Sequence, residues 1–212
     1  SAPLPDITLQ RWEKATGCII LEGYGQTEAG PLVSANFQGS EVIVGSVGKA
    51  LIDTEIEIVD VETGKQILDI NQKGEIRVKG PQIMSGYRNN KAETDEALRN
   101  GWLYTGDIGE FDEDGNLFIL DRKKDMVITG GYNVYPREIE EILYNHTDII
   151  EAAVIGVADE YKGQVLHGFV TVNRRSKIKE GEILNYCRLE LAEYKIPKSI
   201  FIVDQILRTT IG

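Results

Sequence analysis

Apolar and polar residues alternate along two short stretches in the first half of the chain. Residues 55–59 (EIEIV) and 74–78 (GEIRV) place apolar side chains at every second position, which is the period of a strand with one buried face. Turn-forming residues stand at 62–65 and 112–116, so short strands follow one another at hairpin spacing. We therefore predict a small distorted β-barrel or sandwich between about residues 45 and 120.

A helix and a buried strand are expected ahead of this region. The segment Ile7–Thr16 reads as a short helix that Gly17 closes just past its end. The apolar run Cys18–Glu22 then predicts a buried strand. This strand would lead directly into the glycine-containing turn at residues 23–28. Such an order is typical of the end of an α/β subdomain.

The pattern changes again after Asp121. Pro136 suits the first position of a helix, on which Ile139 and Leu143 share one apolar face. Further strands and one amphipathic helix are expected at 152–157, 165–172, 183–191 and 199–203. We therefore predict a mixed α/β chain whose residues 1–121 include the small barrel and whose residues 122–212 form a separate α+β C-terminal domain.

Composition narrows the class of protein. Apolar residues make up 42% and charged residues 27% of the chain, an ordinary balance for a soluble globular protein. The net charge of −11 argues against nucleic-acid binding, which depends on Lys and Arg contacts to phosphate; otherwise the acidity serves solubility. No apolar run approaches the roughly 20 residues of a transmembrane helix. Cys18 and Cys187 show no metal or redox spacing and are expected to be reduced and packed in a cytoplasmic protein.

Three segments carry candidate chemistry. In the first, Tyr24–Glu28 (YGQTE), a strand running into Gly-x-Thr-Glu would place a hydroxyl and a carboxylate where α/β folds bind ligands. In the second, 102–107 (WLYTGD), Asp107 could accept hydrogen bonds from two ribose hydroxyls. Taken alone, each of these two is better explained as a plain turn. The Asp112–Asn116 cluster lacks the later glutamate of a calcium loop, which favours a hairpin turn.

The third segment covers residues 121–140 (DRKKDMVITGGYNVYPREIE). Its cations Arg122, Lys123 and Lys124 stand in a row within an acidic chain, although a solvated charge cluster is the default interpretation. Gly130 and Gly131 lack a Cβ and would let a ligand pass close to the backbone.

In this order and at these distances, the three segments resemble the acyl-adenylate-forming superfamily, which includes acyl-CoA synthetases, peptide-synthetase adenylation domains and beetle luciferases. The resemblance implies an AMP site in which Tyr24 stacks on adenine, Glu28 binds Mg²⁺ and Asp107 holds the ribose. The implied nucleotide and metal residues are Tyr24, Gly25, Gln26, Thr27, Glu28, Asp107, Ile119 and Arg122, with Thr27 and Glu28 as the catalytic pair. Lys124 would be the hinge of the C-terminal domain. Gly130, Gly131 and Tyr132 would line a coenzyme A tunnel.

The implied reaction is ATP-dependent activation of a carboxylic acid as acyl-AMP, followed by transfer to CoA. The GGYNVYPREIE run resembles CoA ligases, and the overall sequence resembles bacterial fatty-acyl-CoA synthetases in particular. A lipid substrate would bring such an enzyme to a membrane surface. Aryl-acid CoA ligases, acyl-AMP ligases and a non-catalytic binding or regulatory module remain alternatives.

Two departures from the family pattern accompany the resemblance. The glycine-rich phosphate loop and most of the acyl pocket are absent, and Leu207 stands where the family has proline. The adenylating lysine of the family would follow Gly212. We therefore expect the chain to be a piece of a longer enzyme that is catalytically silent by itself.

Overall fold

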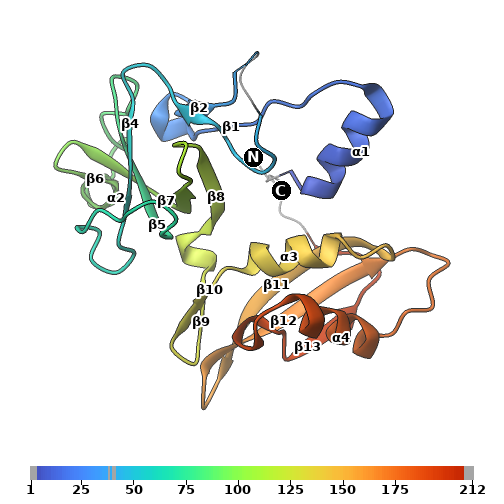
Figure 1. Cartoon of the computed structure of the whole chain (residues 1–212). Coiled ribbons are helices and arrows are strands. Elements are labelled where there is room, and N and C mark those ends of the chain that lie inside the picture. Colours follow the sequence, from blue (N-terminus) through green and yellow to red (C-terminus); the bar gives the residue numbers. More distant parts are fainter. Residues whose placement is uncertain (1–3, 38, 40–41, 208–212) are drawn as a thin grey trace. The chain divides into compact units, whose positions relative to one another are not determined.

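The computed structural model describes residues 4–37, 39 and 42–207. The chain forms two compact units (Figure 1), one of them Thr16–Lys123 and the other composed of the residues up to Ala15 together with those from Lys124 onward. The motif expected at residues 208–212 lies outside the described residues. Within the described ranges, no helix has the length and apolar character needed to cross a membrane.

The unit Thr16–Lys123 begins with a small antiparallel sheet of three two-residue strands. Its order is β1-β2-β3, with β1 at Gly23–Tyr24, β2 at Ser34–Ala35 and β3 at Lys49–Ala50. Between β1 and β2 the chain makes a single 3₁₀ turn, η1, at Thr27–Ala29. The YGQTE segment therefore leaves β1 and enters η1.

A curled five-stranded antiparallel sheet forms the larger part of this unit (Figure 1). Its order is β4-β5-β7-β6, and β8 also pairs with β7. The bounds are β4 Glu55–Val59, β5 Gly74–Lys79, helix α2 Lys91–Ala97, β6 Leu98–Arg99, β7 Trp102–Phe111 and β8 Leu117–Arg122. The predicted alternation is confirmed because Ile58, Ile76 and Val78 lie in one core with Leu103 and Leu117.

The buried strand predicted at Cys18–Glu22 is wrong. This segment has no regular structure, and β1 begins only at Gly23. Ile19 is 69% and Leu21 43% exposed, and Cys18 is exposed rather than packed. Among the described residues, β1 has β2 as its neighbour, and no strand lies beside the apolar run to cover it. Four consecutive apolar residues alone do not make a strand without a pairing partner.

The other unit contains a five-stranded sheet and two helices that share one core. The sheet order is β10-β9-β12-β11, with β13 parallel to β12. The elements are β9 Val127–Thr129, β10 Tyr132–Val134, α3 Pro136–Tyr144, β11 Ile149–Asp159, β12 Gly163–Val172, α4 Glu180–Glu190, η3 Glu193–Lys195 and β13 Ser199–Ile202. The core joins Ile139 and Leu143 of α3, Ile183 and Cys187 of α4, and Val170 of the sheet.

The helix predictions at Ile7–Thr16 and from Pro136 onward are confirmed. Helix α1 spans Asp6–Thr16, and Gly17 after it has a positive φ of 70°. Pro136 occupies the first turn of α3, where its fixed φ suits a helix and its missing N–H costs no hydrogen bond. The strands at 152–157 and 165–172 are longer than predicted and form the hairpin β11–β12.

Candidate functional site

Two residues 83 positions apart in the sequence meet at the centre of the site. Tyr24 ends β1 and Asp107 lies within β7, and the Tyr24 hydroxyl donates a 2.6 Å hydrogen bond to Oδ2 of Asp107. Tyr24 is 9% and Asp107 8% exposed. The hydrogen bond therefore lies in a low-dielectric environment, where it fixes one oxygen of the carboxylate.

The second oxygen of Asp107 faces a cation. Arg122 lies opposite Asp107 in the β7–β8 ladder, and its Nε is 3.6 Å from Oδ1 of Asp107. The Arg122 side chain is 60% exposed. The structure thus brings together three residues expected to bind the nucleotide, and it holds one carboxylate oxygen while the other points toward an accessible guanidinium.

The surroundings shift the pKa values of this pair. Burial raises the pKa of Asp107, while the hydrogen bond from Tyr24 and the charge of Arg122 oppose that rise. Burial, followed by the neighbouring Asp107 charge, raises the pKa of the Tyr24 phenol. Tyr24 is therefore a protonated donor at neutral pH, and the carboxylate is the acceptor.

Thr105 holds the backbone at Asp107. Its hydroxyl accepts a 3.1 Å hydrogen bond from the Asp107 N–H and donates a 2.8 Å hydrogen bond to the carbonyl of Ile76 on β5. Gly106 between them has a positive φ of 71°. The Thr-Gly-Asp segment is thus part of a strand with a local kink, and the interpretation of it as a plain turn is wrong.

Glu28 is positioned by a residue that sequence reasoning missed. Its side chain lies on η1, and the Tyr87 hydroxyl donates a 2.9 Å hydrogen bond to Oε1 of Glu28. The backbone carbonyl of Glu28 also accepts a 2.8 Å hydrogen bond from the Met84 N–H. Partial burial, together with Glu28, raises the pKa of Tyr87 to about 12. Since 59 positions separate Tyr87 from Glu28, no local pattern could have revealed the pair.

The residues between Tyr24 and Glu28 have different structural environments. A Cβ added to Gly25 would lie 1.8 Å from the carbonyl oxygen of Pro31, so only glycine fits there. Gln26 is extended, and its carbonyl accepts from the Ala29 N–H at the start of η1. Thr27 is exposed, which leaves its side chain accessible to a ligand.

Ile119 lies opposite Gly109 on β7 and packs, partly buried, against the core of this unit. Its position on β8 precedes Arg122 by three residues. The predicted contact of Ile119 with the nucleoside stays a prediction.

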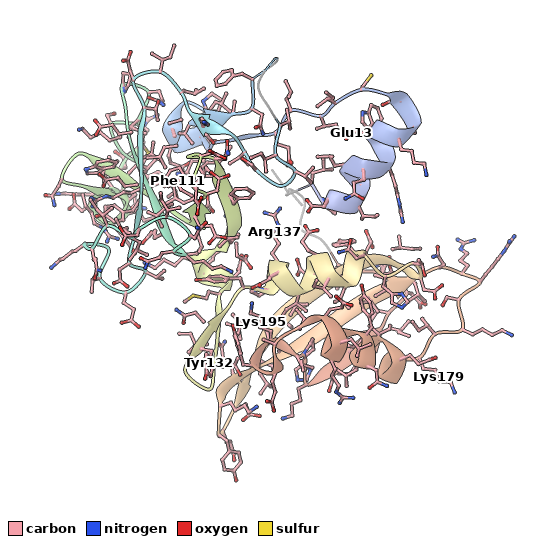
Figure 2. All side chains as sticks on the ribbon, viewed as in Figure 1. Glu13, Phe111, Tyr132, Arg137, Lys179 and Lys195 are labelled. Carbon is pink, nitrogen blue, oxygen red and sulfur yellow. The ribbon has the colours of Figure 1, made fainter. Side chains whose placement is uncertain are left out.

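The glycine pair belongs to the other unit and forms the turn between β9 and β10. Gly130 and Gly131 have positive φ values of 56° and 85°, as a two-residue hairpin turn requires. Tyr132 follows on β10 (Figure 2) and stacks on Tyr194, with 4.6 Å between ring centroids. Lys124 lies in the 3₁₀ turn η2, Lys123–Asp125, and is exposed. The hinge and coenzyme A roles of these residues stay predictions.

Metal chemistry at this site would rest on Glu28. Within the described part of the chain, no group of three or more His, Cys, Asp or Glu side chains could hold a metal ion. Mg²⁺ is commonly bound through one or two carboxylates plus substrate phosphates and water. A single oriented carboxylate is consistent with that donor set.

Comparison with known proteins places this geometry in a family. The family model described as AMP-binding enzyme matches residues 1–88, and that described as AMP-binding enzyme C-terminal domain matches residues 138–212. A long-chain-fatty-acid–CoA ligase of Bacillus subtilis is 44% identical over 212 residues, which cover 100% of this chain and 38% of that protein.

Solved structures agree. The ATP-bound MatB of Rhodopseudomonas palustris superposes with a TM-score of 0.95 at 38% identity, covering 100% of this chain and 42% of that one. The o-succinylbenzoate coenzyme A synthetase MenE of Bacillus subtilis, in complex with ATP and magnesium, gives 0.85 at 36% identity, covering 98% and 42%. The chain thus spans about two fifths of the length of these relatives. Two family models and matches along the whole chain lead to one conclusion: it belongs to the AMP-binding enzyme family.

Proposed function

We propose that this chain is part of an AMP-forming acid–thiol ligase that activates a fatty acid with ATP and transfers the acyl group to coenzyme A. Because the chain spans 38% of the Bacillus subtilis ligase, the activity is proposed for the whole protein. The contribution of this chain would be the nucleoside side of the site and the C-terminal domain.

The proposal rests on the surroundings of the Asp107 carboxylate, which has one oxygen bonded to Tyr24 and the other beside Arg122. A carboxylate only accepts hydrogen bonds, and Tyr24 already occupies one of its oxygens. The other oxygen, beside the exposed Arg122, can accept from the vicinal hydroxyls of a ribose. Burial of the carboxylate strengthens such hydrogen bonds, and Arg122 adds a positive charge for a nearby phosphate.

Glu28 and Thr27 suit the phosphate side of the same nucleotide. Both residues lie on η1, which directly follows Tyr24 along the chain. Mg²⁺, when bound, would neutralise charge on the phosphate oxygens. Tyr87 would keep the Glu28 carboxylate turned in one direction, and the exposed Thr27 hydroxyl could donate to a phosphate oxygen.

The proposed chemistry has two steps. In the first, an oxygen of the fatty-acid carboxylate attacks the α-phosphorus of ATP, and the bond to pyrophosphate breaks. In the second, the sulfur of coenzyme A attacks the acyl carbon, the bond to the AMP oxygen breaks, and the thiol proton passes to solvent. Asp107, Tyr24 and Arg122 hold the nucleoside in both steps, which lowers the entropic barrier by orientation.

The choice of a fatty acid rests on the named relatives. Long-chain-fatty-acid–CoA ligases match this chain at 39–44% identity over nearly all of its length. Proteins named 2-succinylbenzoate–CoA ligase match at 40–42% identity over 91–92% of the chain, so an aromatic acid is the natural competitor in any test.

The test is an acid panel on the full-length protein. Purified enzyme is incubated with ATP, Mg²⁺, CoA and either palmitate, octanoate, benzoate or o-succinylbenzoate, and pyrophosphate and acyl-CoA are quantified. We expect the highest kcat/KM with a fatty acid and a strong loss in an Asp107→Ala variant. Preference for o-succinylbenzoate would overturn the fatty-acid assignment. Absence of pyrophosphate release with every acid would overturn the ligase itself.

A further inference from the structure

Two consecutive cations, Arg122 at the end of β8 and Lys123 at the start of η2, each face a carboxylate of low exposure. Arg122 faces Asp107, whose side chain is 11% exposed, and Lys123 faces Glu75, whose side chain is 4% exposed. The Lys123 Nζ to Glu75 Oε2 distance is 2.7 Å. The second pair is the more buried one, and the nucleotide chemistry described above does not use it.

The two pairs lie on opposite faces of the curled sheet. Asp107 lies opposite Arg122 in the β7–β8 ladder, and the next residue, Ile108, lies opposite Glu75 in the β5–β7 ladder. Because successive residues of a strand point to opposite faces, Asp107 and Glu75 project to different sides. The end of β8 is thus tied on both faces.

Glu75 depends on this cation. It is 3% exposed, and its side chain forms an ion pair with Lys123. A carboxylate this buried is strongly destabilised when its partner is removed, because the charge is then left without compensation. The Lys123 side chain, 36% exposed, is therefore fixed by its ion pair with the buried Glu75.

The compact unit ends at the residue that Glu75 holds. Thr16–Lys123 forms one unit, and the next residue, Lys124, belongs to the other. Lys124 is exposed. The chain therefore passes within one residue from a backbone tied by two ion pairs to a residue outside the unit.

The hinge role that the family resemblance implies for Lys124 means that the C-terminal domain rotates there between acyl-AMP formation and thioester formation. We propose that Glu75 is a positioning residue for the second of these half-reactions: through Lys123 it fixes where the nucleotide-binding unit ends and so confines the rotation to Lys124. This inference rests on the proposed ligase function. Without the Glu75–Lys123 ion pair, Lys123 can move together with the C-terminal domain. The rotation then no longer has a fixed axis at Lys124. The conformation that forms the thioester is then poorly aligned, whereas acyl-AMP formation, which precedes the rotation, proceeds.

The variants are made in the full-length enzyme. Glu75→Gln and Lys123→Met each break the pair, and Lys123→Arg preserves the charge. The double variant Glu75→Leu/Lys123→Met replaces both partners by apolar side chains and leaves no buried charge or polar group of the pair without a partner, which limits the destabilisation where a single variant is unstable. Glu57→Gln is the matched control, because Glu57 forms an ion pair with Arg77 across β4 and β5 of the same sheet.

Two single-turnover rates are measured for each variant. The first is acyl-AMP formation, and the second is conversion of preformed acyl-AMP to acyl-CoA. For Glu75→Gln, Lys123→Met and the double variant, we expect the second rate to fall about 10- to 100-fold, the scale of a small misplacement of reacting groups, and the first to stay within about twofold of wild type. Lys123→Arg and Glu57→Gln should keep the wild-type ratio of the two rates.

Hydrogen exchange gives a readout independent of activity. The backbone amides of residues 121–125 should exchange faster in Glu75→Gln than in wild type, and those in Glu57→Gln should not. An unchanged ratio of half-reactions in the double variant, or the same change in Glu57→Gln, would overturn the anchor. A wild-type enzyme that forms no acyl-AMP would instead overturn the ligase function, and the exchange measurement would still decide whether Glu75 holds residues 121–125.

Discussion

Replacing Tyr24 with phenylalanine removes a single oxygen from the site. The lost hydroxyl donates a 2.6 Å hydrogen bond to Asp107, and the ring remains to fill its place. The Asp107 carboxylate, 8% exposed, then loses its Tyr24 donor and retains the Arg122 Nε at 3.6 Å from Oδ1. The perturbation therefore isolates one charge-assisted hydrogen bond in a buried position.

The magnitude follows from the charge on the acceptor. Hydrogen bonds to charged groups contribute about 1.5–3 kcal/mol to stability, which corresponds to roughly a 10- to 150-fold change in the folding equilibrium. We expect the free energy of unfolding of this unit to fall by about that amount at pH 7. The neighbouring Tyr104→Phe is the control for pH dependence, because its hydroxyl donates to the neutral carbonyl of Gly64 at 2.8 Å and accepts from the Arg77 guanidinium at 3.0 Å. Since arginine stays charged, the loss in this variant should not vary with pH.

The pH dependence supplies a second check. Burial already raises the pKa of Asp107, and the Tyr24 hydrogen bond counteracts this rise, so Tyr24→Phe raises that pKa further. A native pKa above the unfolded value of about 3.9 means that the native state binds the proton first as pH falls. The penalty is then complete above the native pKa and is relieved as pH falls through it toward the unfolded value. The difference between variant and wild type should therefore shrink as pH is lowered from neutral toward the unfolded value of about 3.9.

Urea unfolding followed by fluorescence measures this difference. Of the two tryptophans, Trp102 lies on β7 with Asp107, and a Trp12→Phe background removes the signal from α1. A loss below about 0.5 kcal/mol at pH 7 would refute the strength assigned to the hydrogen bond. A loss that grows as pH falls, or that equals the pH profile of Tyr104→Phe, would refute its link to Asp107.

Four further outcomes are expected in the full-length enzyme. Asp107→Ala should raise the Kd for ATP by about tenfold or more, measured by calorimetry; an unchanged affinity would remove Asp107 from the nucleotide site. Tyr87→Phe should raise the Mg²⁺ concentration needed for half-maximal acyl-AMP formation by about tenfold, because Glu28 loses the donor that orients it; an identical Mg²⁺ titration would contradict this role. Gly131→Leu should slow thioester formation more than acyl-AMP formation in half-reaction assays, whereas equal loss of both would indicate only the strain of a side chain at φ 85°. Lys124→Pro should let acyl-AMP accumulate, because proline restricts its own φ and the residue before it; a normal thioester rate would place the pivot elsewhere.

Much of the fold could be predicted because local periodicity reports burial. The alternation at Glu55–Val59 matches β4 residue for residue, and Pro136 marks the start of α3. The failure at Cys18–Glu22 has a physical reason. A short apolar run has the same composition whether a neighbouring strand covers it or not, and pairing with a distant segment is absent from the local pattern.

The site shows the same limit. The sequence could indicate Tyr24, Glu28 and Asp107 individually through their motifs, and their nucleotide roles stay predictions. It could not indicate that Tyr24 donates to Asp107 or that Tyr87 donates to Glu28, because these pairs depend on sheet register and on the path of a long loop. Hydrogen bonds between elements form through tertiary packing, and no fixed spacing in the sequence marks them.

The run Arg122-Lys123-Lys124 shows how packing separates residues that look equivalent. A solvated charge cluster, the default interpretation of such a run, fails for its first two members, since Arg122 faces Asp107 and Lys123 faces Glu75. Arg122 is the last residue of β8 and Lys123 is the first residue of the turn η2, and their side chains meet different carboxylates. Lys124, also in η2, is exposed. Because Lys123 is paired with a buried carboxylate, we expect charge-conserving exchanges with arginine to be tolerated at Lys123 and charge-removing ones to be harmful there.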